Sequence, residues 1–137
     1  MSDVGGQDLG TSVRSMAVFD RRVESASDAR GWLTAFLDEN DVDEPTVMDA
    51  ALVTSELVTN ALRHGAGPTV LRVVVSAGDL QLSVTDSGDD EPQMLPPDPE
   101  RIGGLGLVVV DRLARRWGVS AFPGGKTVWA ILGRPAP

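Results

Sequence analysis

Two polar side chains near the middle of the chain are spaced so that they could act together. Glu56 and Asn60 lie four residues apart in a segment with helical periodicity, which places them on one helix face, one turn apart. A carboxylate can supply charge or accept a proton, and an amide oxygen is a neutral ligand for a hard cation. The spacing therefore indicates a shared cation or water site opposite the apolar face, with a solvated helix face as the alternative.

Asp86 is the second candidate, because it ends an alternating run of apolar residues. Leu80, Leu82 and Val84 alternate toward an expected core, and Asp86 falls in phase with them. A carboxylate that points inward needs a hydrogen-bond donor to offset its desolvation, and an exocyclic amine of a ligand would serve. The alternative is that residues 86–89 form only a turn.

The third candidate is a glycine-rich sequence at an expected helix start, Gly103-Gly104-Leu105-Gly106-Leu107. Glycines there let backbone N–H groups approach an anion, and the helix dipole favours phosphate at that end. The sequence is not the dinucleotide fingerprint, because the third glycine is missing and a proline-rich loop precedes it in place of a strand.

A later sequence, Gly125-Lys126-Thr127, has the ending of a P-loop but not its context. A P-loop needs another glycine five residues before Gly125, where Ser120 stands. It also needs a helix afterwards, whereas residues 127–132 read as a strand. A P-loop is therefore excluded.

Eight elements are expected to position these residues. Ser25 or Ser27 should cap the first helix, Pro45 suits the first position of the second, and Gly65 and Gly67 end that helix. The expected elements are a strand at 13–19, helices from the cap to residue 40 and at 46–64, strands at 69–75 and 80–86, a helix at 105–116, and strands at 117–122 and 127–132.

This order predicts an α+β fold, in which strands pair with strands and helices group together. We expect a two-layer sandwich with a mostly antiparallel mixed sheet and helices on one face. One domain at 13–133 would lie between tails at 1–12 and 134–137. Residues 87–103 form a long loop of the kind used as a lid or binding loop. Arg112, Arg115 and Arg116 would form a basic helix face, either solvated or used to bind a partner.

The composition excludes several classes of function. The 137 residues carry 12 Lys and Arg against 20 Asp and Glu, a net charge of −8, which argues against nucleic acid or an anionic membrane as the partner. With no Cys and one His, thiol catalysis, disulfides and multi-histidine metal sites are excluded. No signal segment or membrane span is visible, so a cytoplasmic protein is expected.

In this order and spacing, the motifs resemble those of the GHKL ATPase family, which has the Bergerat fold. Residues 55–64, Ser-Glu-Leu-Val-Thr-Asn-Ala-Leu-Arg-His, resemble the N box, and 84–88, Val-Thr-Asp-Ser-Gly, the first glycine box. Residues 104–107 resemble the second glycine box, and 125–128 the late motif that closes the pocket. More narrowly, the chain resembles the small stand-alone anti-sigma-factor serine/threonine kinases and their relatives in bacterial regulatory switches. It departs from the family at Asp90, where the first glycine box usually has a second glycine.

The resemblance implies a role for each matching residue. Asn60 would ligate Mg²⁺ bridging the phosphates of ATP, and Glu56 would orient or activate the attacking hydroxyl. Asp86 would accept a hydrogen bond from the adenine amino group. The remaining implied nucleotide contacts are Gly88 beside the base, Thr127 at the adenine through water, Arg101 at the terminal phosphate, and the backbone of Gly104, Leu105, Gly106 and Leu107 at the phosphates.

The resemblance also implies partners and leaves an alternative function open. A kinase of this type holds a sigma factor and phosphorylates an anti-anti-sigma antagonist in a bacterial partner-switching system, and a homodimer is possible. The alternative is a non-catalytic module of the same fold, either nucleotide-binding or degenerate, which sequesters a regulatory protein.

Overall fold

The computed structural model describes residues 12–88 and 106–135, which form strands and helices in the expected order. The elements are β1 (Val13–Phe19), α1 (Ser25–Glu39), α2 (Glu44–His64), β2 (Thr69–Val75), β3 (Asp79–Asp86), α3 (Gly106–Leu113), β4 (Arg116–Phe122) and β5 (Gly125–Gly133).

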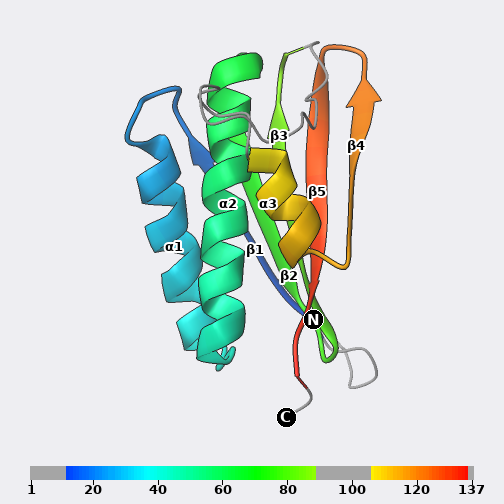
Figure 1. Cartoon of the computed structure of the whole chain (residues 1–137). Helices are drawn as coiled ribbons and strands as arrows, with labels where there is room; N and C mark the ends of the chain where they lie inside the picture. Colours follow the sequence, from blue (N-terminus) through cyan, green and yellow to red (C-terminus); the bar gives the residue numbers. More distant parts are fainter. Residues whose placement is uncertain (1–11, 89–105, 136–137) are drawn as a thin grey trace.

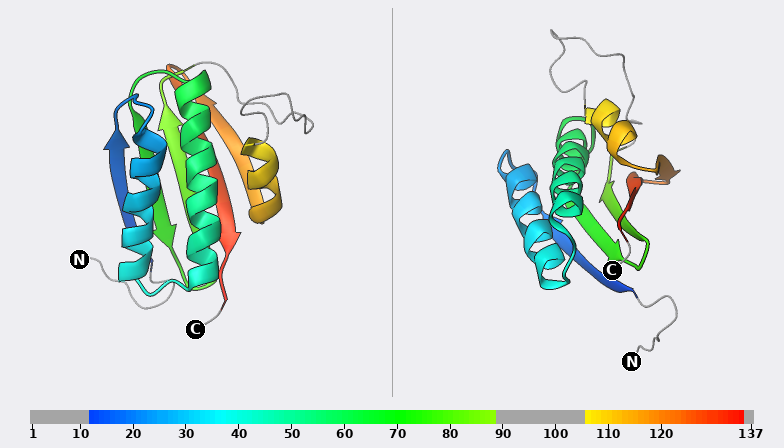
Figure 2. Two further views of the ribbon diagram at one scale, coloured as in Figure 1. Left: turned by 60° about the vertical axis from the view of Figure 1, so that its left-hand side comes forward. Right: turned by 60° about the horizontal axis from the view of Figure 1, so that its bottom comes forward.

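The strands form one sheet, and the helices lie on one of its faces (Figures 1 and 2). The strand order is β1-β2-β3-β5-β4, and every neighbouring pair is antiparallel. The predicted α+β two-layer fold is thereby confirmed, but the described sheet is antiparallel throughout and not mixed. The reason is that α1 and α2 run in opposite directions, so the chain returns to the end of the sheet where β1 finished (Figure 1).

The core lies between the helices and the inward face of the sheet. Leu33 and Leu37 of α1 are fully buried, as are Val53 of α2 and Leu82 of β3. Each such side chain contributes roughly 1.5–3 kcal/mol by its removal from water. Val53 is buried together with leucines and alanines of α2, so the buried face of this helix is wide.

The two long helices begin differently from the prediction. Neither Ser25 nor Ser27 caps α1: Glu24 is the N-cap and makes no side-chain cap bond. Ser25 is instead buried as the first helical residue, and its hydroxyl donates to the carbonyl oxygen of Asp20. Helix α2 begins two residues earlier than expected, because the Asp43 carboxylate accepts a bond from the Thr46 N–H group at 3.1 Å.

The third helix is shorter than predicted, and this separates the basic residues. Helix α3 ends at Leu113, and Arg116 already belongs to β4. Arg115 lies between them and reaches Asp79 at 3.4 Å. The three arginines therefore do not share a helix face. In the expected C-terminal tail, the guanidinium of Arg134 donates to the carbonyl oxygen of Ser76 at 3.0 Å.

Within the described residues, none of the helices is both long enough and apolar enough to cross a membrane.

Candidate functional site

Asp86 is a buried carboxylate at the end of β3. The residue is 4% exposed. Its Oδ1 accepts a hydrogen bond from the Gly88 N–H group at 2.6 Å and another from Lys126 Nζ at 3.0 Å. Lys126 is the cross-strand neighbour of Asp86 in β5 and is itself 3% exposed. The inward position expected for Asp86 is therefore observed, and its partner within the chain is a lysine.

Two glycines make room for this carboxylate. A Cβ atom on Gly65, the C-cap of α2, would lie 2.4 Å from Cγ of Asp86. A Cβ atom on Gly88 would lie 2.6 Å from Cα of Gly65. The Ser87 N–H group also donates to the Ala66 carbonyl oxygen at 2.8 Å. The end of α2 and the end of β3 are thus joined backbone to backbone, with the Asp86 carboxylate enclosed between them.

Gly65 was expected only to end the helix, and the structure gives it this second role. The backbone of Gly65 has φ −105°, a conformation open to any residue, so the requirement for glycine comes from space and not from the backbone angle. Gly88, expected to lie beside a base, packs on Gly65 and donates its N–H group to Asp86. Both glycines therefore act by positioning the carboxylate.

Asn60 lies near the end of α2, five residues before Gly65, and is buried, with 8% of its surface exposed. Its Nδ2 atom has no hydrogen-bond partner in the part of the chain that the structure describes. A buried amide without a partner costs free energy unless a ligand satisfies it. Because the oxygen and nitrogen of an amide can exchange places by a flip, the atom without a partner can equally be the oxygen. The prediction that Asn60 faces away from the apolar side is wrong, and its orphaned amide is what a ligand-contacting residue requires.

Glu56 is half-buried one turn before Asn60. Among residues 12–88 and 106–135, its carboxylate has neither an ion pair nor a hydrogen bond, so its charge is available to a bound group. The same residues contain no group of three or more His, Asp or Glu side chains that could hold a metal ion. A divalent cation at Asn60 would take most of its ligands from water and phosphate oxygens, as Mg²⁺ commonly does.

Thr127 does not point toward this site. Its side chain lies on the outer face of the sheet, where its Oγ1 is 2.7 Å from Oγ1 of Thr85. Successive residues of a strand alternate between faces, so the inward residue of the pair is Lys126, in phase with the buried Val128. The motif therefore indicated Thr127, whereas Lys126 is the residue that points inward beside Asp86. The alternation of apolar residues along β5 is the signal that could have found Lys126.

The predicted phosphate-binding backbone is described only at its end. Arg101, Gly104 and Leu105 lie outside the described residues, as does Asp90. Gly106 is the first residue of α3, so its N–H group belongs to the helix start as expected. The side chain of Leu107 is buried in the core, so the predicted phosphate contact of this residue would have to come from its backbone.

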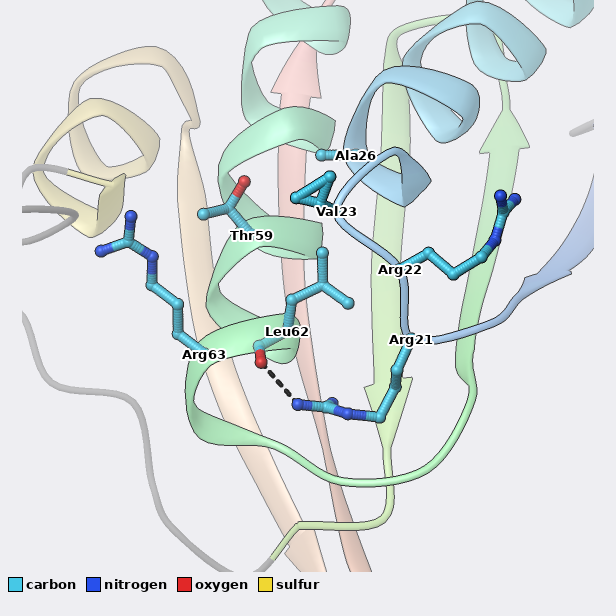
Figure 3. A pocket seen from close by; sticks show the side chains of 7 residues that line it. All are labelled: Arg21, Arg22, Val23, Ala26, Thr59, Leu62 and Arg63. Carbon is cyan, nitrogen blue, oxygen red and sulfur yellow. Dashed lines mark hydrogen bonds between the residues drawn. The ribbon is translucent and has the colours of Figure 1, made fainter.

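A separate surface pocket of about 400 Å³ lies between the start of α1 and the end of α2 (Figure 3). Its lining contains none of the predicted site residues and consists of Arg21, Arg22, Val23, Ala26, Thr59, Leu62 and Arg63. Arg21 donates to the carbonyl oxygens of Ala61 and Leu62, and Arg22 pairs with Asp28 at 3.2 Å. Two of the arginines are therefore already engaged in holding the end of α2 and the start of α1.

Comparison with known proteins gives one family and one fold. The family model described as histidine kinase-like ATPase domain matches residues 19–132. The crystal structure of the RsbU and RsbW domains of Rv1364c from Mycobacterium tuberculosis is similar, with a TM-score of 0.69 and 23% sequence identity. The match covers 90% of this chain and 34% of that chain, so this chain spans about a third of its length. The search of curated proteins finds no match.

Proposed function

This chain belongs to the histidine kinase-like ATPase domain family, and on that premise we propose that it binds Mg-ATP at the junction of α2 and β3. The observation that carries the proposal is the buried Asp86 carboxylate, enclosed by Gly65 and Gly88. Its Oδ2 atom receives no hydrogen bond from the described residues, so it is left to accept one from the adenine amino group.

The phosphates would extend from the base toward Asn60 and the start of α3. The Asn60 amide would ligate Mg²⁺, which supplies charge neutralisation to the phosphates when bound. The N–H group of Gly106 would lie with those of Gly104, Leu105 and Leu107 at the phosphates, and Arg101 would neutralise the terminal one.

We assign the chemistry to Glu56, as an anti-sigma-factor-like serine/threonine kinase would use it. Its carboxylate would accept the proton of a protein hydroxyl as that oxygen bonds to the γ-phosphorus of ATP. The bond from the γ-phosphorus to the bridging oxygen breaks, and ADP leaves with that electron pair. The absence of a partner for Glu56 among the described residues supports this role.

The proposed partners are a sigma factor and an anti-anti-sigma antagonist, in a bacterial partner-switching system in the cytoplasm. The likeness to a structure that includes an RsbW domain supports this choice. Nucleotide would change the affinity for each partner, so that one is released as the other is bound. A homodimer is compatible with this arrangement.

One observation favours a second candidate function. The Lys126–Asp86 pair gives the carboxylate a charged donor with no nucleotide present. A degenerate module that sequesters a protein partner without using ATP would need such an internal partner for a buried acid.

Two measurements separate the candidates. We expect Mg-ATP to raise the melting temperature of the wild-type chain, and unchanged melting would remove the nucleotide proposal. Labelled ATP and an antagonist protein from the same organism should then yield phosphoserine or phosphothreonine, with transfer lost in Glu56→Gln. Transfer at the wild-type rate in Glu56→Gln would remove Glu56 from its proposed role. Mg-ATP binding without transfer would favour a module that binds nucleotide without catalysis, and no binding at all would favour the degenerate module.

A further inference from the structure

Lys126 carries more hydrogen-bonding capacity than the described chain uses. Its ammonium group has three protons, and the residue is 3% exposed. Among residues 12–88 and 106–135, it has one acceptor, Oδ1 of Asp86 at 3.0 Å. A buried ammonium group with further donors needs further acceptors, because each unmade hydrogen bond costs free energy.

Asp86 has the complementary surplus. Both of its hydrogen bonds, from Lys126 and from Gly88, end on Oδ1. Within the described residues, Oδ2 accepts none. The pair therefore offers a free carboxylate acceptor beside a free ammonium donor, and both project from paired strands onto the inward face of the sheet.

This arrangement matches one edge of one base. Adenine presents an amino donor at position 6 next to an acceptor nitrogen at position 1. Hypoxanthine and guanine reverse both, with an acceptor oxygen at position 6 and a donor N–H at position 1. If the amino group bonds to Asp86, the nitrogen at position 1 faces Lys126. Hypoxanthine or guanine would place an acceptor oxygen against the Asp86 carboxylate and a donor N–H group against the Lys126 ammonium group.

We propose that Lys126 is a base-reading residue that donates a hydrogen bond to N1 of adenine while Asp86 accepts one from the amino group. The inference rests on the proposed function and moves the second adenine contact from Thr127 to Lys126. Thr127 lies on the opposite face of the sheet, with its hydroxyl on Thr85. The competing possibility is that Lys126 fills the space of the base and excludes it.

The test removes the acceptor from the ligand and the donor from the protein. Dissociation constants of the full chain are measured for Mg-ATP and Mg-1-deaza-ATP, which lacks the N1 acceptor. For the wild type we expect 1-deaza-ATP to bind about 10-fold or more weakly, the effect of losing one hydrogen bond to a charged group.

Two variants of Lys126 then connect this loss to the residue. Lys126→Met keeps the length of the side chain without its donors, and should bind both nucleotides equally. Lys126→Gln keeps an N–H donor, and should restore much of the preference for ATP. Circular dichroism and nucleotide-free melting show whether each variant is folded. If neither is folded, the affinities of the wild type for Mg-ATP and Mg-1-deaza-ATP still test whether N1 is recognised.

Each adverse outcome has its own meaning. Equal binding of the two nucleotides by the wild type overturns the role of Lys126 and leaves the proposed function intact. A preference for ATP that persists in Lys126→Met, or tighter ATP binding by that variant, also overturns it, the latter by showing that Lys126 excludes the base. A wild type that binds neither nucleotide overturns the proposed function together with the inference.

Discussion

A methyl group on Gly65 would stand 2.4 Å from Cγ of Asp86, although 20 intervening residues separate the two in the sequence. Real Cβ atoms do not approach other atoms so closely, so one of the two groups would have to move. The end of α2 and the carboxylate of β3 therefore occupy their positions together. Any change that widens the helix end displaces the group proposed to bind adenine.

Gly65→Ala should consequently lower both stability and nucleotide binding. We expect a loss of about 1–3 kcal/mol, typical of overpacking, and weaker Mg-ATP binding than in the wild type. Urea unfolding and nucleotide titration provide the measurements. Gly31→Ala is the matched control, because a Cβ atom there meets nothing within 4 Å and glycine inside a helix is unfavourable. If both variants unfold at the same urea concentration, the contact has no energetic weight.

The fold could be predicted largely from the sequence because its elements are strongly periodic. The alternation of Leu80, Leu82 and Val84 fixed the inward phase of Asp86, and the strand bounds at 13–19 and 69–75 agree with the structure. The starts of helices were less predictable. Asp43 and Ser25 are both capping residue types, and only tertiary packing decides that one caps a helix and the other is buried.

The candidate site was predictable where one element determines it and not where two elements meet. The proximity of Glu56 and Asn60 follows from helical spacing alone, whereas the burial of Asn60 depends on packing between elements. The packing of Gly65 on Asp86 depends on where α2 stops relative to β3, which no local pattern encodes. Lys126 was not predicted because the resemblance to the late motif indicated Thr127. Which of the two side chains points inward depends on the phase of the strand.

The Lys126–Asp86 pair should be strongly coupled in stability. Removing one partner leaves a buried charge without compensation, so Lys126→Met and Asp86→Asn should each be destabilising, with about 3–5 kcal/mol as the usual range for a broken buried pair. The double variant has neither charge and should lose less than the sum of the two. Urea unfolding of all four proteins measures the coupling. Additive losses would show that the two side chains do not interact.

Arg21 should stabilise the end of α2. Its guanidinium donates to the carbonyl oxygen of Leu62 in the last turn of the helix, the bond drawn in Figure 3. It also donates to the carbonyl oxygen of Ala61, which accepts the Gly65 N–H group as well. Arg21→Ala should cost about 1–2 kcal/mol, measured by thermal or urea unfolding. Arg22→Ala is the adjacent control, since its ion pairs with Glu24 and Asp28 are exposed and should contribute less than about 1 kcal/mol. Equal losses in the two variants would contradict a capping role for Arg21.

Asp43 should make stability depend on pH at the start of α2. The hydrogen bond from the Thr46 hydroxyl lowers the pKa of Asp43 below its ordinary value, and the bond from the Thr46 N–H group adds to this against the opposing effect of desolvation. A carboxylate with a lowered folded-state pKa stabilises the fold above its unfolded pKa. That contribution disappears as pH falls through the folded value.

The control for this effect is Asp43→Asn, which keeps the cap without a titrating group. We expect the wild type to lose more stability than Asp43→Asn between pH 6 and about pH 3, a range that spans the ordinary Asp pKa, with the loss concentrated below that pKa. Melting curves across that range provide the comparison. Parallel pH profiles for the two proteins would show that the cap does not depend on charge.

Asn60→Ala should abolish the response to nucleotide at little cost to the fold. The Nδ2 atom of Asn60 has no partner among the described residues, so its removal breaks no protein hydrogen bond. At a concentration 100 times its dissociation constant, Mg-ATP should stabilise the wild type by about 2.7 kcal/mol, or roughly 10 °C for a domain of this size. Melting with and without Mg-ATP measures both effects.

The matched control is Thr54→Val on the same helix. The Thr54 hydroxyl is also buried and unpartnered among the described residues, and valine has nearly the same shape, so this variant should be as stable as the wild type or more so. It should retain the full Mg-ATP shift, because Thr54 lies in the core and not beside the proposed phosphates. If Asn60→Ala keeps that shift, Asn60 does not hold the cation. If Thr54→Val loses it, the effect of Asn60→Ala cannot be assigned to ligation.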